Sequence, residues 1–316
     1  MEPRRAIGHH VRVSPVSRGR KNARSRGSGQ RVVRSVPAAP PEPCDCPTCS
    51  GRDLDLETLV EGMMISATNL LGTDDPIEAE LFGASFLAAG VAGDLPGDEV
   101  IRVMTESIVP AAAKYANREA LALLLALDTM AVGPAPAEAA RRVREAGVQA
   151  PSWADEVREP LRVDRCRRYV DAAAESSTLT CLFERAGRGH GFAVGVDHGD
   201  CGAASDIVLL TPGELEEFTH TMETGAGAVV VTELPDPAEF RWQIERALDA
   251  RAVHDLEDDE PVLPDEDDED GPGYHLLAAL LQARMNTLPE PPRPPAPHGD
   301  ETADPGDAGA GRARRR

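Results

Sequence analysis

The strongest constraint on the fold is a long stretch, residues 54–147, in which apolar side chains recur at helical spacing. Glycine, proline, aspartate and asparagine interrupt this stretch and predict five consecutive helices. Asp75 is the predicted N-cap of the second helix, the fourth helix is expected to open at Asn117, and Pro110 is expected to kink or divide the third. The fourth helix is apolar nearly all round, so it should be the most buried. Short connections between successive helices favour an antiparallel bundle or stack.

Beyond Pro151 the sequence changes to short runs of apolar and β-branched residues, which are typical of strands. Three such runs precede a helix, a further strand and two more helices, predicted in order over 177–187, 190–198, 205–211, 211–225, 226–234, 236–255 and 271–288. Gly187, Arg188 and Gly189 are the predicted turn between the first two strands, because glycine tolerates positive φ. The chain is therefore predicted to be α+β, with an N-terminal helical bundle or stack followed by a small, mainly antiparallel sheet with flanking helices.

Both ends of the chain are predicted to be disordered, because they hold too little apolar surface to offset the entropy of ordering. Four regions follow from this: a basic arm with a proline-rich linker (1–43), a cysteine motif with the helical domain (44–150), the α+β domain (151–288) and a tail rich in proline and glycine (289–316). An acidic loop over 255–271 interrupts the α+β domain, and eleven acids lie between Asp255 and Asp270. We expect this loop to be solvated, although it could also attract a basic partner or divalent cations.

Charge is distributed unevenly along the chain. Residues 1–35 hold ten basic residues and one acidic one, a net charge of +9, whereas the whole chain carries −21 and the remainder therefore −30. The acidic body should repel nucleic acid and anionic membranes, and the basic arm could contact nucleic acid only weakly. No apolar run is long enough to span a bilayer, and the N-terminus lacks the apolar core of a secretory signal. We therefore expect a cytoplasmic protein without membrane contacts, whose partners are mainly other proteins.

The segment CDCPTCSG places three thiols, Cys44, Cys46 and Cys49, within six residues. Thiolates at this spacing can share one zinc ion, so zinc is the one cofactor that the sequence indicates. A second interpretation is a redox dithiol, but the proline-rich residues that precede the motif count against it. A loop with free thiols is the third interpretation. The six cysteines of the chain do not make a disulfide framework. A fourth zinc ligand would have to come from Cys166, His190, His198 or another chain.

A second segment, VDHGDCGAASDIVLL, brings His198, Asp200, Cys201 and Asp206 together between two apolar runs. Imidazole, carboxylate and thiolate groups suit Zn²⁺, so His198 and Asp200 are candidate metal ligands. Alternatively, Cys201 could be a nucleophile with His198 as its base. The neighbouring glycines favour a third interpretation, a tight turn in which aspartate side chains accept hydrogen bonds from nearby N–H groups. Catalytic groups three residues apart in a turn seldom have the required geometry, so we prefer the turn.

Four segments together resemble a group of proteins from high-GC actinobacteria. The resemblance spans roughly Cys44 to His298. The four segments are CDCPTCSGRDLD, VDHGDCGAASDIVLL, DPAEFRWQIERALDARAVHD and DEDGPGYHLLAALLQAR. This resemblance implies no particular activity. The first segment also resembles the cysteine motif of SEC-C-type zinc modules, but Arg52 and Asp53 stand where that motif ends in a further Cys or His pair.

The familiar catalytic signatures are missing from the sequence, which contains no Walker-type phosphate loop, strand-linked GxGxxG, HExxH or GxSxG. We therefore predict a non-enzymatic protein that acts through protein–protein contacts or as a regulatory module. One alternative is a nucleic-acid-associated regulator with a zinc knuckle at Cys44–Cys49 and the basic arm as its contact surface. The other is a metal-dependent or cysteine hydrolase centred on His198, Asp200, Cys201 and Asp206.

Overall fold

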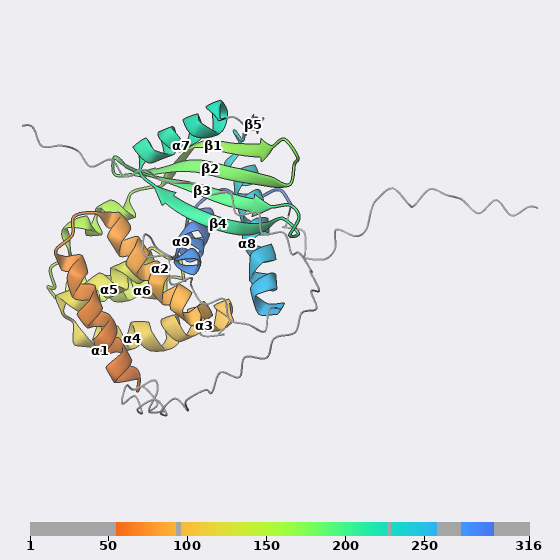
Figure 1. Cartoon of the computed structure of the whole chain (residues 1–316). Helices are drawn as coiled ribbons and strands as arrows, with labels where there is room; N and C mark the ends of the chain where they lie inside the picture. Colours follow the sequence, from red (N-terminus) through yellow and green to blue (C-terminus); the bar gives the residue numbers. More distant parts are fainter. Residues whose placement is uncertain (1–54, 93–95, 226–228, 258–272, 294–316) are drawn as a thin grey trace, which may run out of the picture. The chain divides into compact units, whose positions relative to one another are not determined.

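The structure, a computed structural model, describes residues 55–92, 96–225, 229–257 and 273–293 (Figure 1). They belong to one compact unit of the chain, Asp53–Arg316. The predicted fold class is confirmed within these residues, because helices come first and a five-stranded antiparallel sheet with flanking helices follows. The predicted disordered residues 1–43 and 294–316, the Cys44–Cys49 motif and residues 258–271 of the predicted acidic loop lie outside the described residues.

The N-terminal helices follow the sequence predictions closely. They are α1 (Leu56–Ala67), α2 (Pro76–Ala92), α3 (Gly97–Val103), α4 (Val109–Tyr115), α5 (Arg118–Asp128) and α6 (Ala135–Glu145), with a 3₁₀ turn at Thr68–Leu71. The predicted cap is confirmed, because Asp75 Oδ1 accepts a hydrogen bond from the Ile77 N–H at 3.2 Å. Helix α5 opens at Asn117 as predicted, and the Asn117 side chain is its N-cap, with Oδ1 accepting from the Ala120 N–H at 2.8 Å. A π-helical turn divides the predicted third helix just before Pro110, which lies in the first turn of α4, where no N–H is needed.

Helix α5 is the centre of the helical core, as predicted. Every residue from Ala120 to Leu127 is buried, and α1, α2, α4 and α6 pack against this helix. Gly83 lets α2 approach closely, because a Cβ there would lie 2.4 Å from the Ala126 carbonyl oxygen. Trp153 is fully buried in the same core, and its Nε1 donates to the Leu70 carbonyl oxygen at 2.7 Å. The tight helix contact and this hydrogen bond fix the helical part of the fold.

The sheet contains one strand more than the sequence predicts. Its strands are β1 (Arg162–Asp171), β2 (Ser176–Arg185), β3 (Arg188–Asp197), β4 (Ala203–Leu210) and β5 (Val229–Glu233), in the order β4-β3-β2-β1-β5. The unpredicted strand is β1, whose sequence RVDRCRRYVD is dominated by charged residues. A bulge between Asp164 and Arg167 also breaks its alternation, since the partners change from Leu182 to Thr180 across that step.

The hairpin turn begins one residue earlier than predicted and is one residue shorter. Ala186 and Gly187, both with positive φ, make a two-residue turn, and Arg188 and Gly189 belong to β3. The prediction of a turn over residues 187–189 is therefore wrong in its extent. Two central residues with positive φ match the right-handed twist of the flanking strands.

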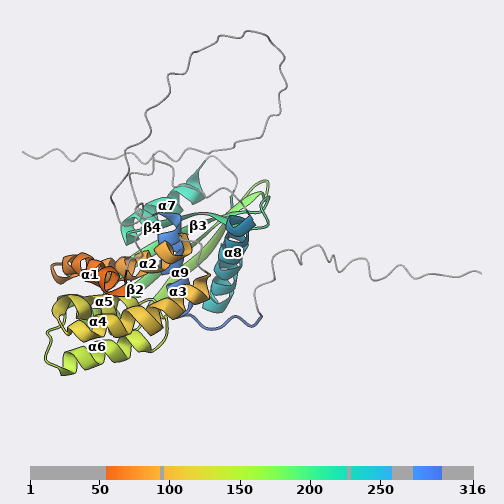
Figure 2. The ribbon, with the colours of Figure 1, turned by 90° about the horizontal axis from the view of Figure 1, so that it is seen from below.

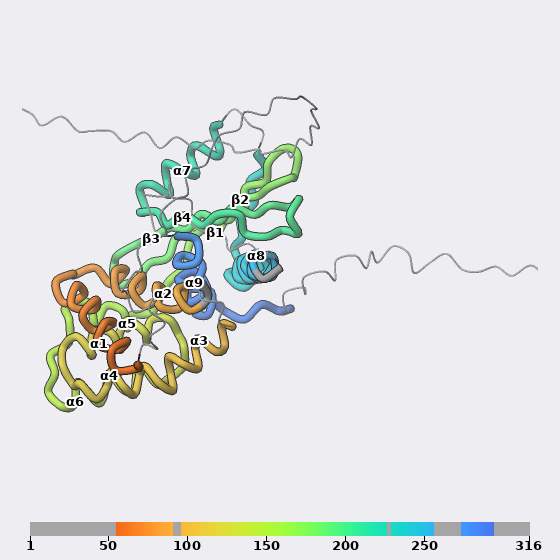
Figure 3. Tube along the Cα trace, turned by 60° about the horizontal axis from the view of Figure 1, so that its bottom comes forward, coloured from red at the N-terminus to blue at the C-terminus, as the bar shows by residue number. Residues whose placement is uncertain are grey.

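The two faces of the sheet are covered unequally (Figure 1 and Figure 3). Helices α8 (Pro237–Glu257) and α9 (Tyr274–Met285) bury one face, where the strands contribute Cys181 to the apolar core as predicted. Helix α7 (Pro212–Thr224) lies on the other face, and Leu215 is the one buried residue of this described helix. A Cβ at Gly191 would lie 2.9 Å from a Leu215 methyl carbon, so this glycine seats α7 on β3.

Helix α2 packs on both parts of the fold, against α5 on one side and α9 on the other (Figure 2). Ala79 belongs to the helical core, whereas Ile77 and Ala84 belong to the core beneath the sheet. Between them, the buried carboxylate of Glu80 pairs with Arg185 of β2 and Arg284 of α9. Within the described ranges, no helix combines the length and apolar character needed to cross a bilayer.

Candidate functional site

The segment predicted to hold His198, Asp200 and Cys201 folds as the tight turn between β3 and β4. Asp197 Oδ1 accepts a hydrogen bond from the Gly199 N–H at 2.8 Å, and the Gly202 N–H donates to the Asp197 carbonyl at 2.9 Å. Cys201 has φ +54° and Gly202 has φ +76°, so two successive residues adopt the left-handed conformation. The segment therefore has the aspartate-capped turn geometry that the sequence favours.

The side chains of this turn have separate partners. His198 Nε2 lies 3.0 Å from Ser177 Oγ and 3.3 Å from a guanidinium nitrogen of Arg168. Because a guanidinium can only donate, Nε2 acts as the acceptor and the ring proton is on Nδ1. Burial and the Arg168 charge lower the pKa of His198, so this ring is neutral near pH 7. Asp200 instead faces His254, with Oδ2 3.3 Å from Nδ1.

The turn does not assemble a catalytic or metal-binding group among the residues that the structure describes. Cys201 is exposed and forms no hydrogen bond with His198, and Asp206 Oδ1 accepts from the adjacent Ile207 N–H at 2.8 Å. In the same described ranges, no three His, Cys, Asp or Glu side chains group as metal ligands. The zinc site at Cys44, Cys46 and Cys49 stays a prediction, since these residues lie outside the described ranges.

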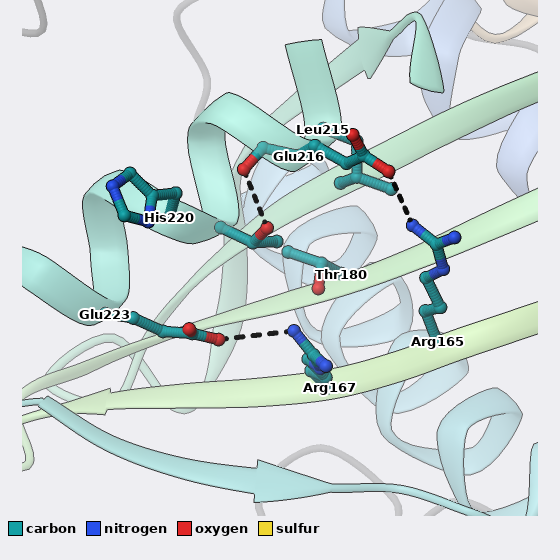
Figure 4. A pocket seen from close by; sticks show the side chains of 8 residues that line it. Arg165, Arg167, Thr180, Leu215, Glu216, His220 and Glu223 are labelled. Atoms are coloured by element: carbon teal, nitrogen blue, oxygen red, sulfur yellow. Dashed lines mark hydrogen bonds and ion pairs between the residues drawn. The ribbon is translucent and has the colours of Figure 1, made fainter. Parts of the chain in front are cut away.

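A cavity of about 270 Å³ lies on the face of the sheet that α7 covers, between α7 and strands β1 and β2 (Figure 4). We call it the α7 cavity. Two strands supply its floor and one helix its wall, so residues far apart in the sequence meet there. Its lining consists of Arg165, Arg167, Thr180, Leu215, Glu216, Thr219, His220 and Glu223.

Two arginines reach from β1 toward two glutamates of α7 (Figure 4). Arg165 Nη1 lies 3.0 Å from Glu216 Oε1, and Arg167 Nη1 lies 3.2 Å from Glu223 Oε1. The Arg167 Nε also donates to Glu233 of β5 at 2.7 Å. Arg165 is 49% exposed and Glu216 is 67% exposed, so water competes for their groups. Ion pairs this open contribute only about 0–1 kcal/mol each and exchange partners readily.

The backbone of β1 is strained where it presents Arg165. This residue has φ +54°, in the left-handed region that favours glycine, and it lies inside the bulge of β1. Residues other than glycine pay roughly 1–2 kcal/mol in this conformation. Strained bulges of this kind often re-aim a side chain next to a functional site. Here the bulge carries a guanidinium to the mouth of the α7 cavity.

Thr180 is the most deeply buried polar group of the cavity lining. Its residue is 1% exposed, and its Oγ1 has no hydrogen-bond partner among the described residues. A buried hydroxyl without a partner is unusual, because desolvation costs about 1–3 kcal/mol when no hydrogen bond replaces water. Nearby, burial raises the pKa of Tyr169, whose hydroxyl lies 3.5 Å from Glu223 Oε1. The floor of the cavity therefore offers a donor that nothing in the described protein uses.

Sequence reasoning missed all the residues of the α7 cavity. The available signal was the run of four arginines between Arg162 and Arg168, but its residues were not recognised as a strand. The comparison with known proteins does not supply a function either: the chain matches no protein-family model, no curated protein and no solved structure. Function must therefore be inferred from the geometry of this cavity and its surroundings.

Proposed function

We propose that the protein is a non-enzymatic regulatory module that binds a small oxyanion-bearing ligand, a carboxylate or a phosphate, in the α7 cavity. The observation that carries this proposal is the buried Thr180 hydroxyl, which has no hydrogen-bond partner among the described residues and belongs to the same cavity lining as Arg165 and Arg167. Guanidinium groups bind carboxylate and phosphate oxygens through paired N–H donors, and a hydroxyl adds a third donor.

Binding exchanges one set of carboxylates for another. The ligand oxygens take the place of Glu216 and Glu223 on the two arginines, and the released glutamates turn to solvent. This exchange is inexpensive, because exposed ion pairs contribute little. Opening the Arg167–Glu223 pair uncovers the floor of the cavity, where Thr180 gains the hydrogen bond that it lacks. Hydrogen bonds to a charged group contribute about 1.5–3 kcal/mol, so the ligand complex is favoured.

The size and openness of the cavity support binding over catalysis. A volume of about 270 Å³ lies just below the usual range of small-molecule sites, which suits a ligand of a few carbon atoms. Catalytic sites strengthen their electrostatics by excluding water, whereas Arg165 and Glu216 are about half or more exposed. A ligand that rearranges the contacts of α7, which buries only Leu215, can alter the surface presented to a partner.

Calorimetric titration at fixed ionic strength tests this proposal. The panel contains short mono- and dicarboxylates, phosphomonoesters and uncharged amides of the same size. We expect saturable binding of one oxyanion class, weakened at least 10-fold in Arg167→Met and about 5-fold in Thr180→Val. The matched control is Arg141→Met, which changes an exposed arginine of α6. Binding that Arg141→Met weakens as much as Arg167→Met, or no saturable binding of any anion, would contradict the proposal.

A second candidate function, pairing with an extended segment of a partner protein, is favoured by strand β5. Among the described strands β5 pairs with β1 alone, which leaves its other edge open, and Val230 is 63% exposed. Open edges with apolar side chains accept an added strand. Val230→Lys should abolish such an interaction, whereas Ile65→Lys on the exposed side of α1 should not. Equal effects of both substitutions would argue against strand pairing.

A further inference from the structure

A second cluster of charges is buried where α2, β2 and α9 meet. The carboxylate of Glu80 accepts hydrogen bonds from Arg185 through one oxygen and from Arg284 through the other. Three elements that are distant in the sequence therefore converge on one carboxylate. Two guanidinium charges share this single negative charge, so the cluster has a net charge of +1 in the protein interior.

The cluster also has unused donors. The Nε–H groups of Arg185 and Arg284 are buried and have no hydrogen-bond partner among the described residues. Arg188 lies at the same place but is neutralised, because its Nε donates to Glu156 at 2.9 Å. A buried positive charge with unused N–H donors is strongly unfavourable unless an anion or a polar group satisfies it.

Both arginines also line a small cavity. Its volume is about 10 Å³, about the space of one water-sized sphere, which is too small for a phosphate or a carboxylate. Apolar, cationic and other polar side chains contribute to its lining, which consists of Pro76, Ile77, Glu80, Phe183, Arg185, Arg188, His190 and Arg284. A neutral water would satisfy the N–H groups but leave the charge uncompensated.

We infer that this cavity is a binding site for one monovalent halide ion, chloride in ordinary solutions. The ion accepts hydrogen bonds from the two guanidinium groups and brings the cluster to neutrality. The halide then joins α2, β2 and α9 through Glu80, Arg185 and Arg284, so it acts as a structural ion. The site is separate from the α7 cavity and shares no lining residue with it.

Thermal unfolding of the full chain in sodium chloride, sodium bromide and sodium gluconate, at one ionic strength, tests this inference. A ligand that binds only the folded state raises Tm with the logarithm of its concentration. We expect Tm to be roughly 2–4 °C higher in chloride or bromide than in gluconate. Coincident melting curves in all three salts would overturn the inference and leave water in the cavity.

Variants separate the site from general salt effects. Arg185→Met should remove the halide dependence, and Arg141→Met, which changes an exposed arginine, should keep it. Glu80→Gln raises the net charge of the cluster and should strengthen the halide dependence several-fold, the opposite of what simple disruption would do. A weaker dependence in a folded Glu80→Gln variant would contradict the inference.

A direct measurement avoids any dependence on how the variants fold. Chloride that exchanges with a protein site broadens the ³⁵Cl resonance, and bromide competes for the same site. We expect excess broadening with the unmodified protein that bromide reverses. If the broadening does not exceed that of the same chloride solution without protein, the site does not bind chloride.

Discussion

Glu80 and Arg284 form an ion pair in which each side chain is 5% exposed, although 204 positions separate them in the sequence. We predict that Glu80→Ala lowers the free energy of unfolding by about 3–5 kcal/mol, because it leaves two buried guanidinium groups without their counter-charge. Urea unfolding followed by tryptophan fluorescence measures this loss. Glu145→Ala is the control, since it breaks an exposed pair with Arg141 and should cost about 0.3–0.5 kcal/mol. Similar losses in both variants would show that the buried pair contributes no more to the free energy of unfolding than the exposed pair does.

Thr180→Val should stabilise the protein in the absence of ligand while it weakens the binding of oxyanions. The substitution replaces a buried hydroxyl that has no partner with a methyl group of similar shape. We expect a gain of about 1 kcal/mol in the free energy of unfolding. Chemical denaturation measures the gain, with Thr178→Val on the same strand as the comparison. A loss of stability in Thr180→Val would mean that the hydroxyl has a partner in solution.

Arg165→Gly and Arg165→Ala remove the same guanidinium group but differ in their backbone preference. Glycine adopts φ +54° without strain, whereas alanine retains the strain of the native residue. Arg165→Gly should therefore be more stable than Arg165→Ala by about 1 kcal/mol, measured by denaturant unfolding. Both variants should bind oxyanions more weakly than the unmodified protein. Equal stability of the two would place Arg165 outside the left-handed conformation.

His190 should make the protein less stable in mild acid. Burial, followed by the Arg284 charge, lowers the pKa of His190 below 6.5, and Arg188 acts in the same direction against Asp75 and Glu80. The unfolded chain then binds more protons than the folded one, so this contribution to stability is complete above pH 6.5. It is lost as the pH falls from 6.5 through the folded pKa.

Urea unfolding at pH 7.5 and pH 5.5 measures this effect. The unmodified protein should lose more stability between these two conditions than His190→Gln does, because glutamine does not titrate. Parallel losses would assign the acid sensitivity to other groups.

Three of the cysteines should differ sharply in their reactivity. Cys201 is exposed, whereas Cys166 and Cys181 are buried in the core beneath the sheet. Burial raises the pKa of Cys166 to about 12 and also raises that of Cys181, so neither forms a thiolate near pH 8. Iodoacetamide labelling read by peptide mass spectrometry should modify Cys201 alone among these three until urea unfolds the chain. Labelling of Cys181 in the folded state would contradict its place in the core.

Local signals in the sequence predict the helices well. Asp75 is recognisable as a cap because an N-cap acts within three residues, and the break at Pro110 follows from the missing N–H of proline. The turn after Asp197 follows equally from its aspartates and glycines. These interactions join residues that are only a few positions apart, so a single sequence suffices to predict them.

The candidate sites could not be predicted because they depend on distant partners. Strand β1 is rich in arginine, and the bulge at Arg165 breaks the alternation by which strands are recognised. Thr180 becomes a site residue only because α7 lies over it on the folded sheet. Arg284 lies in an apolar helix, where its burial is explained only by Glu80 on α2. Charged residues of this kind are normally assigned to the surface.

Because α2 contributes Ala79 to one apolar core and Ile77 and Ala84 to the other, neither half of the fold can be cut away cleanly. A chain shortened after residue 150 would keep α2 but present its α9-facing side chains, with the Glu80 carboxylate among them, to water. A chain beginning at residue 151 would lack the helix that shields its sheet core. We therefore expect either half to be insoluble when it is produced alone. A shortened chain of either half would have to retain α2.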